Sequence, residues 1–112
     1  MAKFHFQKLD SLGLITIKER FTLMDKDDFQ SVLENVDLAE QEVALDLRNL
    51  EYIDSSGIGD LIKLKMESKK HNNAVYVFGI KGAVEKAFNS AKLDSVFTVL
   101  TEEEAQEKFA LP

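Results

Sequence analysis

Hydrophobic and polar residues alternate with two different periods along this chain, and each period predicts a different kind of element. Phe4 and Phe6 are separated and followed by polar residues, which is the period of a half-buried strand, and residues 12–21 are rich in β-forming side chains. The Asp10-Ser11 pair between these two segments indicates a tight turn. We therefore expect the chain to open with a β-hairpin.

Three later segments have apolar residues at intervals of three and four, the spacing of an amphipathic helix. The stripes are Phe29, Val32, Leu33 and Val36; Ile58, Leu61, Ile62 and Met66; and Val84, Ala87, Phe88 and Ala91. Asp25 precedes the first stripe and is expected to cap its helix. A fourth helix, ending near Phe109, is predicted by the capping box that Thr101 can form with Glu104.

Short apolar runs separate these helices and are suited to buried strands. They cover residues 43–47, 75–78 and 96–100, whereas residues 49–53 are expected to form a loop. Strands that alternate with helices favour parallel pairing, and the opening hairpin adds an antiparallel pair. The order predicts one α/β domain over residues 1–112, with a mixed, mostly parallel sheet and about four packed helices.

The composition of the chain argues against several classes of function and site. The 112 residues have a formal net charge of −6, which argues against direct nucleic-acid binding because that affinity comes from Lys and Arg neutralising phosphates. The chain has no cysteine, so disulfides and thiolate metal sites are excluded. It has no apolar run of signal-peptide or membrane-spanning length. We expect a cytoplasmic protein that binds neither membrane nor cofactor.

The unusual stretch of the chain is residues 54–59, DSSGIG, between a buried strand and the second helix. The plainest interpretation is that Ser55 or Ser56 caps this helix, because serine is a preferred N-cap residue. The two glycines suggest a further requirement, since Gly57 and Gly59 each cost a helix about 1 kcal/mol relative to alanine. Missing side chains beside Ser55 would let the backbone of a kinase or another partner lie on this turn.

Residues 47–62, LRNLEYIDSSGIGDLI, resemble the signature of the STAS domain of bacterial anti-sigma-factor antagonists. The preceding VALDL, the later VYVFGIKGAVEKAFNSAKLDSVFTVLTEEEA and the order of elements resemble that family as well. The resemblance implies that Ser55, the first serine after the aspartate, is the phosphoacceptor. It also implies that partner-binding positions fall on Asp54, Ser56, Gly57 and Ile58.

The resemblance further implies that the protein is a switch, which acts by binding a partner protein and not by catalysis. Unphosphorylated members of the family bind an ATP-using anti-sigma-factor serine kinase and so release a sigma factor. The kinase inactivates them by phosphorylation, and a phosphatase restores them. One departure concerns residues 20–25, RFTLMD, which lack the glycine of the family's Gly-x-Leu/Ile-Asp segment. Asp25 is therefore a candidate partner contact as well as a helix cap.

Two other functions are alternatives to this phosphorylation-controlled switch. A STAS subunit that docks on a transporter's ATPase would need no phosphorylation. A serine hydrolase would need a base near the serine, but the only imidazoles are His5, in the first strand, and His71, in a polar turn. The acids at 102–104 suit the first turn of a helix better than a metal site. We predict no catalytic residue and no metal.

Overall fold

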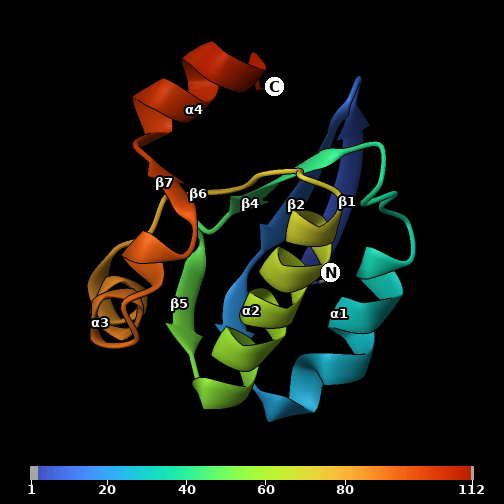
Figure 1. The fold of residues 1–112 in the computed structure, drawn as a ribbon. Helices are drawn as coiled ribbons and strands as arrows, with labels where there is room; N and C mark the ends of the chain where they lie inside the picture. The colour runs from blue at the N-terminus through green and yellow to red at the C-terminus, as the bar shows by residue number, and fades with distance from the viewer. Residues whose placement is uncertain (1–2, 112) are drawn as a thin grey trace.

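The main sheet has five strands in the order β1-β2-β4-β6-β7, and a separate two-stranded sheet pairs β3 with β5 (Figure 1). The computed structural model describes residues 3–111. Its strands are β1 (Phe4–Leu9), β2 (Leu12–Ile17), β3 (Glu19–Phe21), β4 (Glu42–Asp46), β5 (Leu50–Ile53), β6 (Val75–Phe78) and β7 (Thr98–Leu100). Its α-helices are α1 (Lys26–Leu33), α2 (Ser55–Lys70), α3 (Gly82–Ser90) and α4 (Glu102–Phe109).

The strand pairing confirms the predicted mixed, mostly parallel sheet. β1 and β2 form the expected antiparallel hairpin, in which Leu9 pairs with Leu12 across the Asp10-Ser11 turn. The pairs β2–β4, β4–β6 and β6–β7 are all parallel. The capping box between Thr101 and Glu104 is also present at the start of α4. The last strand is shorter than predicted, because a 3₁₀ turn at Leu93–Ser95 leads into it.

The expected single strand over residues 12–21 is in fact two strands. Glu19, the first residue of β3, has a left-handed backbone with φ of 64° that interrupts the regular extended chain, and the pairing of β3 shifts register between Glu19 and Arg20. β3 therefore leaves the main sheet and pairs with residues that were predicted as a loop. Within that predicted loop, Leu50–Ile53 forms β5, and Leu50 and Ile53 are buried.

α1 and α2 lie side by side over one face of the main sheet, and α3 lies beside β5 (Figure 1). The predicted stripe of α2 is correct for Ile58, Leu61 and Ile62, which lie in or against the main core, and wrong for Met66, which is 56% exposed. Leu64, which was not predicted, is buried in that core.

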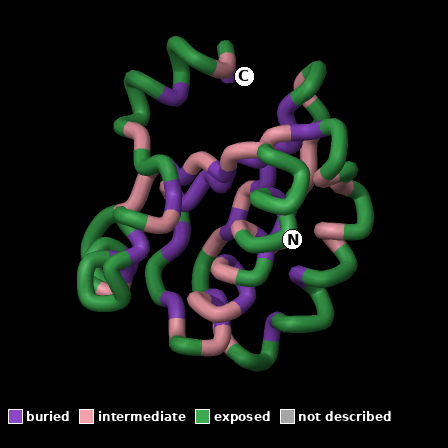
Figure 2. The backbone as a smooth tube through the Cα atoms, in the orientation of Figure 1, coloured by how far each residue is buried: buried purple, intermediate pink, exposed green. Residues whose placement is uncertain are grey.

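The main core lies between the sheet and these helices, and three phenylalanines anchor its α1 side. The ring centroids of Phe4, Phe21 and Phe29 are 4.9–5.7 Å apart, in tilted and edge-on arrangements that favour aromatic pairs. Alternate strand residues point the other way. Leu14 and Ala44 belong to a second cluster, which α4 covers through Ala105. The central strands β2, β4 and β6 are mostly buried, whereas the outer strands and the helices carry a mixture of buried and exposed residues (Figure 2).

The loops after β4 and β6 pack together at the carboxyl ends of these strands. Buried Asp46 accepts hydrogen bonds from Arg48, whose Nη2 lies 2.8 Å from Asp46 Oδ2. Gly79 lies directly on this turn in a left-handed conformation, with φ of 82°. A Cβ atom at Gly79 would lie 2.8 Å from the backbone nitrogen of Arg48. The Cγ of Arg48 would lie still closer, and because backbone atoms are also in contact, a movement of the Arg48 side chain alone cannot make room for a larger residue.

We predict that Gly79→Ala lowers the free energy of unfolding by about 2 to 4 kcal/mol, since it combines a left-handed backbone with a steric overlap. Gly82→Ala is the matched control, because Gly82 also has a positive φ, 57°, but open space around its Cβ position. Urea unfolding of the two variants measures the difference. Equal losses would show that the contact with Arg48 contributes nothing.

Candidate functional site

The DSSGIG segment follows β5, and its neighbour in space is the turn that follows β3. The two strands are parallel, and Phe21 pairs with Ile53 at their carboxyl ends. The chain therefore leaves both strands on the same side, which brings the turn at residues 22–25 next to Asp54. Both turns lie at the amino ends of helices, at the lower edge of the view in Figure 1.

Asp54, and not a serine, is the N-cap of α2. Its Oδ1 accepts a hydrogen bond from the backbone N–H of Gly57 at 2.9 Å. Its Oδ2 accepts one from the backbone N–H of Leu23 at 3.1 Å. The backbone N–H of Asp54 donates to the carbonyl oxygen of Phe21 at 3.1 Å. The expectation that Ser55 or Ser56 is the cap is therefore wrong, because the carboxylate of Asp54 accepts the N–H of Gly57 at the start of the helix.

Ser55 is the first residue of α2, and its side chain is exposed. Ser56 follows it and is half-buried. Because Asp54 supplies the cap, the hydroxyl of Ser55 is not needed to complete the helix. The structure thus places Ser55, among the predicted site residues, where another protein can reach it most directly.

The two glycines of the motif have different surroundings, and Gly57 has an internal role. Gly57 is buried, and a Cβ there would lie 2.8 Å from both the carbonyl oxygen of Phe21 and the Cγ1 of Ile53. The close approach that it permits is thus to β3 and β5 of the same chain. Gly59 has open space at its Cβ position. Ile58 is half-buried against the main core.

Asp25 is buried and fully engaged by its own chain, contrary to its predicted role as the side-chain cap of α1. Its carboxylate accepts hydrogen bonds from Lys3 Nζ and from the backbone N–H of Thr22, each at 2.9 Å. It closes a capping box on the 3₁₀ turn at Leu23–Asp25, and makes no side-chain cap to α1. Burial raises the pKa of Asp25, but the contacts with Lys3 and Thr22 outweigh it and leave the pKa below its ordinary value.

Sequence reasoning missed the two most exposed apolar residues of this region. Leu23 is 63% exposed and Met24 is 89% exposed, and they project from the turn that Asp54 holds against α2. The sequence feature that could have identified them is a pair of large apolar residues between Thr22 and Asp25, which can form a capped turn. We call Leu23, Met24 and Ser55 the switch surface.

The two histidines of the chain, which were considered only as possible bases of a serine hydrolase, lie on other parts of the fold. His71 follows the last residue of α2, about 24 Å from Ser55 along the 16-residue helix. His5 is exposed on β1. Within residues 3–111, no group of three or more His, Asp or Glu residues is placed to hold a metal ion. No helix in that range has the length and apolar character needed to cross a bilayer.

Comparison with known proteins identifies the family of this chain. The model of the STAS domain matches residues 4–105. The chain belongs to the STAS-domain family. A STAS-domain containing protein of Pseudomonas aeruginosa is 27% identical over 85 residues, which cover 76% of this chain and 84% of that protein. A STAS domain is typically a regulatory module without catalysis.

Solved structures share the fold at low identity. The crystal structure of a putative anti-sigma factor antagonist from Thermotoga maritima superposes on this chain with a TM-score of 0.81 and 17% sequence identity. The superposition covers 96% of this chain and 95% of that protein. Unphosphorylated SpoIIAA, an anti-sigma factor antagonist, has a TM-score of 0.78 with 16% identity, covering 97% and 98%. A sulfate transporter family protein from Wolinella succinogenes has a TM-score of 0.73 with 15% identity, covering 90% and 86%.

We predict that Gly57→Ala destabilises the protein by about 1 to 3 kcal/mol, because the added methyl group overlaps the backbone of β3. Gly59→Ala, two residues along the same helix, should instead stabilise it by up to about 1 kcal/mol. Thermal or urea unfolding of the two variants tests this opposition. A destabilising Gly59→Ala would show that the first turn of α2 is constrained by more than the contact at Gly57.

Asp25 should make stability depend on pH in the acid range. Its folded pKa lies below the ordinary value of 3.8, so its charge stabilises the protein above about pH 4, and this contribution is lost as the pH falls through the folded pKa. Asp25→Asn should cost about 1 to 2 kcal/mol at pH 7, and this cost should decrease progressively as the pH falls below about 4.

Urea unfolding at several pH values measures this effect. Asp28→Asn, an exposed carboxylate on α1, is the control and should show a small effect at both ends of the range. An Asp25→Asn cost that stays constant from pH 7 to pH 3 would contradict the charge-based account.

Proposed function

We propose that this chain is an anti-sigma-factor antagonist, a non-catalytic switch that binds an anti-sigma kinase while Ser55 is unmodified. Binding withdraws the kinase from its sigma factor and so regulates sigma-factor-dependent transcription in the cytoplasm. The kinase transfers the terminal phosphoryl group of ATP to the Ser55 hydroxyl, and a phosphatase later hydrolyses that ester. The observation that carries the proposal is an exposed Ser55 whose helix is already capped by its neighbour, Asp54.

The surroundings of Ser55 support binding by a protein partner. The centre of a protein interface is rich in large apolar side chains, including methionine, and is surrounded by a polar rim. Leu23 and Met24 have this character, and the hydrogen bond from the Leu23 N–H to Asp54 fixes their turn beside α2. A partner that covers this turn therefore also covers Ser55.

Phosphorylation of Ser55 would act on this interface without unfolding the domain. The phosphate adds about −1.5 to −2 charge, and a helix N-terminus tolerates an anion. The N–H of Gly57 is already bonded to Asp54, however, so this donor is not available to the phosphate, which would also be hydrogen-bonded to solvent at the exposed Ser55. In a complex that solvent is displaced and Asp54 lies close by. Like charges juxtaposed at an interface cost several kcal/mol.

The test is binding of three forms of the full chain to the cognate anti-sigma kinase by calorimetry. Ser55→Ala should bind like the unmodified protein, phosphorylated Ser55 should bind about 100-fold or more weakly, and Ser55→Asp should lie between them. Amide NMR shifts should change only around the switch surface. Equal affinities for the three forms would contradict the mechanism.

Ser31→Ala is the matched control, because Ser31 is an exposed helical serine on α1. It should leave both phosphate uptake and kinase binding unchanged. Ser56→Ala tests the neighbouring hydroxyl of the motif. Peptide mapping of protein recovered from its own host should find phosphate on Ser55. Phosphate found mainly on Ser56 would move the acceptor by one residue but keep the switch.

The alternative is a STAS subunit that docks on a transporter ATPase without phosphorylation, and its support is the likeness in fold to the sulfate transporter family protein. The two functions differ in their response to charge. A docking subunit should retain its partner when Ser55 is phosphorylated. Its partner should be a membrane transporter's ATPase, and not a small kinase.

A further inference from the structure

The sulfur chemistry of this chain is confined to methionine, and the switch surface carries the more exposed of the two described methionines. The chain has three methionines and no cysteine, so a peroxide that reaches it meets thioethers and no thiol. Met1 lies outside the described residues. Met24 is 89% exposed, whereas Met66 is 56% exposed. Between these two, a reagent dissolved in water is expected to oxidise Met24 first.

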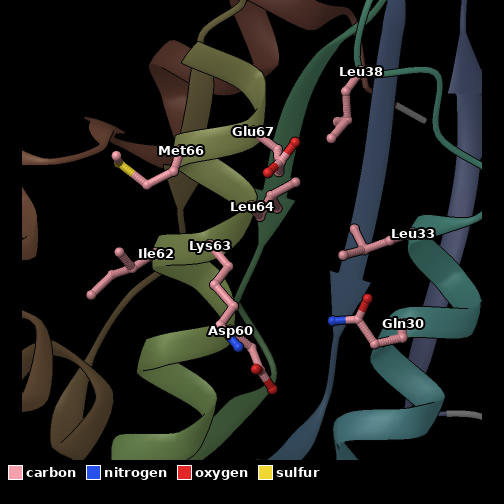
Figure 3. Close-up of a pocket in the computed structure, with 9 residues that line it drawn as sticks. All are labelled: Gln30, Leu33, Leu38, Asp60, Ile62, Lys63, Leu64, Met66 and Glu67. Carbon is pink, nitrogen blue, oxygen red and sulfur yellow. The ribbon is translucent and has the colours of Figure 1, made fainter. Parts of the chain in front are cut away.

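Met66 differs from Met24 in position as well as in exposure. It lies on α2 eleven residues after Ser55, which is about 16 Å along the helix axis. Its side chain extends from α2 on the side away from Leu33 of α1 (Figure 3). Oxidation of Met66 therefore adds no oxygen to the surface around Ser55, and Met66 is an internal control for Met24.

The turn that presents Met24 is held by hydrogen bonds that do not involve the Met24 side chain. Thr22 Oγ1 accepts the backbone N–H of Met24 at 3.2 Å, and Asp25 Oδ2 accepts the backbone N–H of Thr22 at 2.9 Å. Asp54 Oδ2 accepts the backbone N–H of Leu23 at 3.1 Å. An oxygen added to the Met24 sulfur breaks none of these bonds. It therefore changes the chemistry of the switch surface while the fold is kept.

We propose that Met24 is an oxidation site through which a peroxide turns the switch off without phosphorylation, an inference that rests on the function proposed above. The sulfur lone pair attacks one oxygen of hydrogen peroxide, so that an S–O bond forms and the O–O bond breaks. The transferred oxygen gives its proton to the departing hydroxide, which leaves as water. Sulfur is oxidised by two electrons and the peroxide is reduced. A thiol-dependent methionine sulfoxide reductase reverses the change, since two thiols form a disulfide and the oxygen leaves as water.

The sulfoxide acts on the interface through its polarity. A thioether packs against an apolar partner surface, whereas the sulfoxide oxygen is a hydrogen-bond acceptor that binding would remove from water. Burial of a polar group without a donor is unfavourable. Because Asp54 fixes the turn of Met24 beside the start of α2, a partner that is excluded from Met24 is also excluded from Ser55. The oxidised protein should therefore neither hold the kinase nor be phosphorylated by it.

The first experiment measures selectivity and needs no partner. The full chain is treated with hydrogen peroxide, and mass spectrometry follows the sulfoxide in each tryptic peptide, since cleavage after Lys and Arg places the three methionines in separate peptides. Met24 should oxidise at least about twofold faster than Met66, and the melting temperature should change little, as for other changes at exposed positions. Equal or faster oxidation of Met66, or unfolding that accompanies oxidation of Met24, would contradict the proposal.

The second experiment compares kinase binding before and after oxidation within each variant, so that any effect of the substitution itself cancels. The peroxide is removed before calorimetry with the cognate anti-sigma kinase. Met66→Leu, which keeps Met24, should lose about tenfold or more in affinity on oxidation and regain it after treatment with the reductase. Met24→Leu should lose less than about twofold, because leucine is apolar but has no sulfur to oxidise. An equal loss in the two variants would overturn the proposal.

A parallel titration separates this inference from the function on which it rests. The unoxidised chain with phosphorylated Ser55 is measured against the same kinase. If binding is lost on phosphorylation of Ser55 but kept on oxidation of Met24, the oxidation site is wrong and the phosphorylation switch stands. If the kinase does not bind the unmodified chain, both are wrong. The inference requires that each modification alone weakens binding.

Discussion

One carboxylate, that of Asp54, holds together the two segments from which the switch surface is built. Each of its oxygens accepts a backbone N–H, one from Gly57 and one from Leu23. The first bond begins a helix and the second fixes the turn that precedes another helix. Without Asp54, the N-terminus of α2 and the turn after β3 would each have a free N–H at the same edge. Everything that we infer about Ser55 depends on this arrangement.

This bridge requires the backbones to approach closely, and Gly57 makes that possible. Its missing side chain lets α2 begin against the carbonyl oxygen of Phe21, which in turn accepts the N–H of Asp54. Asp54 and Gly57 build the turn, whereas Ser55 is exposed and takes no part in the cap. In the switch that we propose, these two structural residues hold in place the residue that is phosphorylated.

The sequence allowed most of the fold to be predicted but less of the site. A period of two identified the opening strand, short apolar runs identified the buried strands, and a period of three to four identified three helices, because burial determines these patterns. The capping box of Thr101 and Glu104 identified the fourth helix. β5 was missed because a half-exposed four-residue strand has too short a pattern. Roles in the site were harder to predict, since the bond from the Leu23 N–H to Asp54 and the bond from Lys3 to Asp25 join residues 31 and 22 positions apart.

Leu23 and Met24 contribute little to the core, while the turn that carries them is held by Thr22, Asp25 and Asp54. Substitutions at such exposed positions usually change stability by less than about 0.5 kcal/mol. In the switch that we propose, the partner contacts at these two positions can therefore change without a change of scaffold. Several domains of this kind in one cell would avoid one another's partners when each turn carries a shape or charge that the wrong partner rejects. Single substitutions in this turn are enough to supply such a difference.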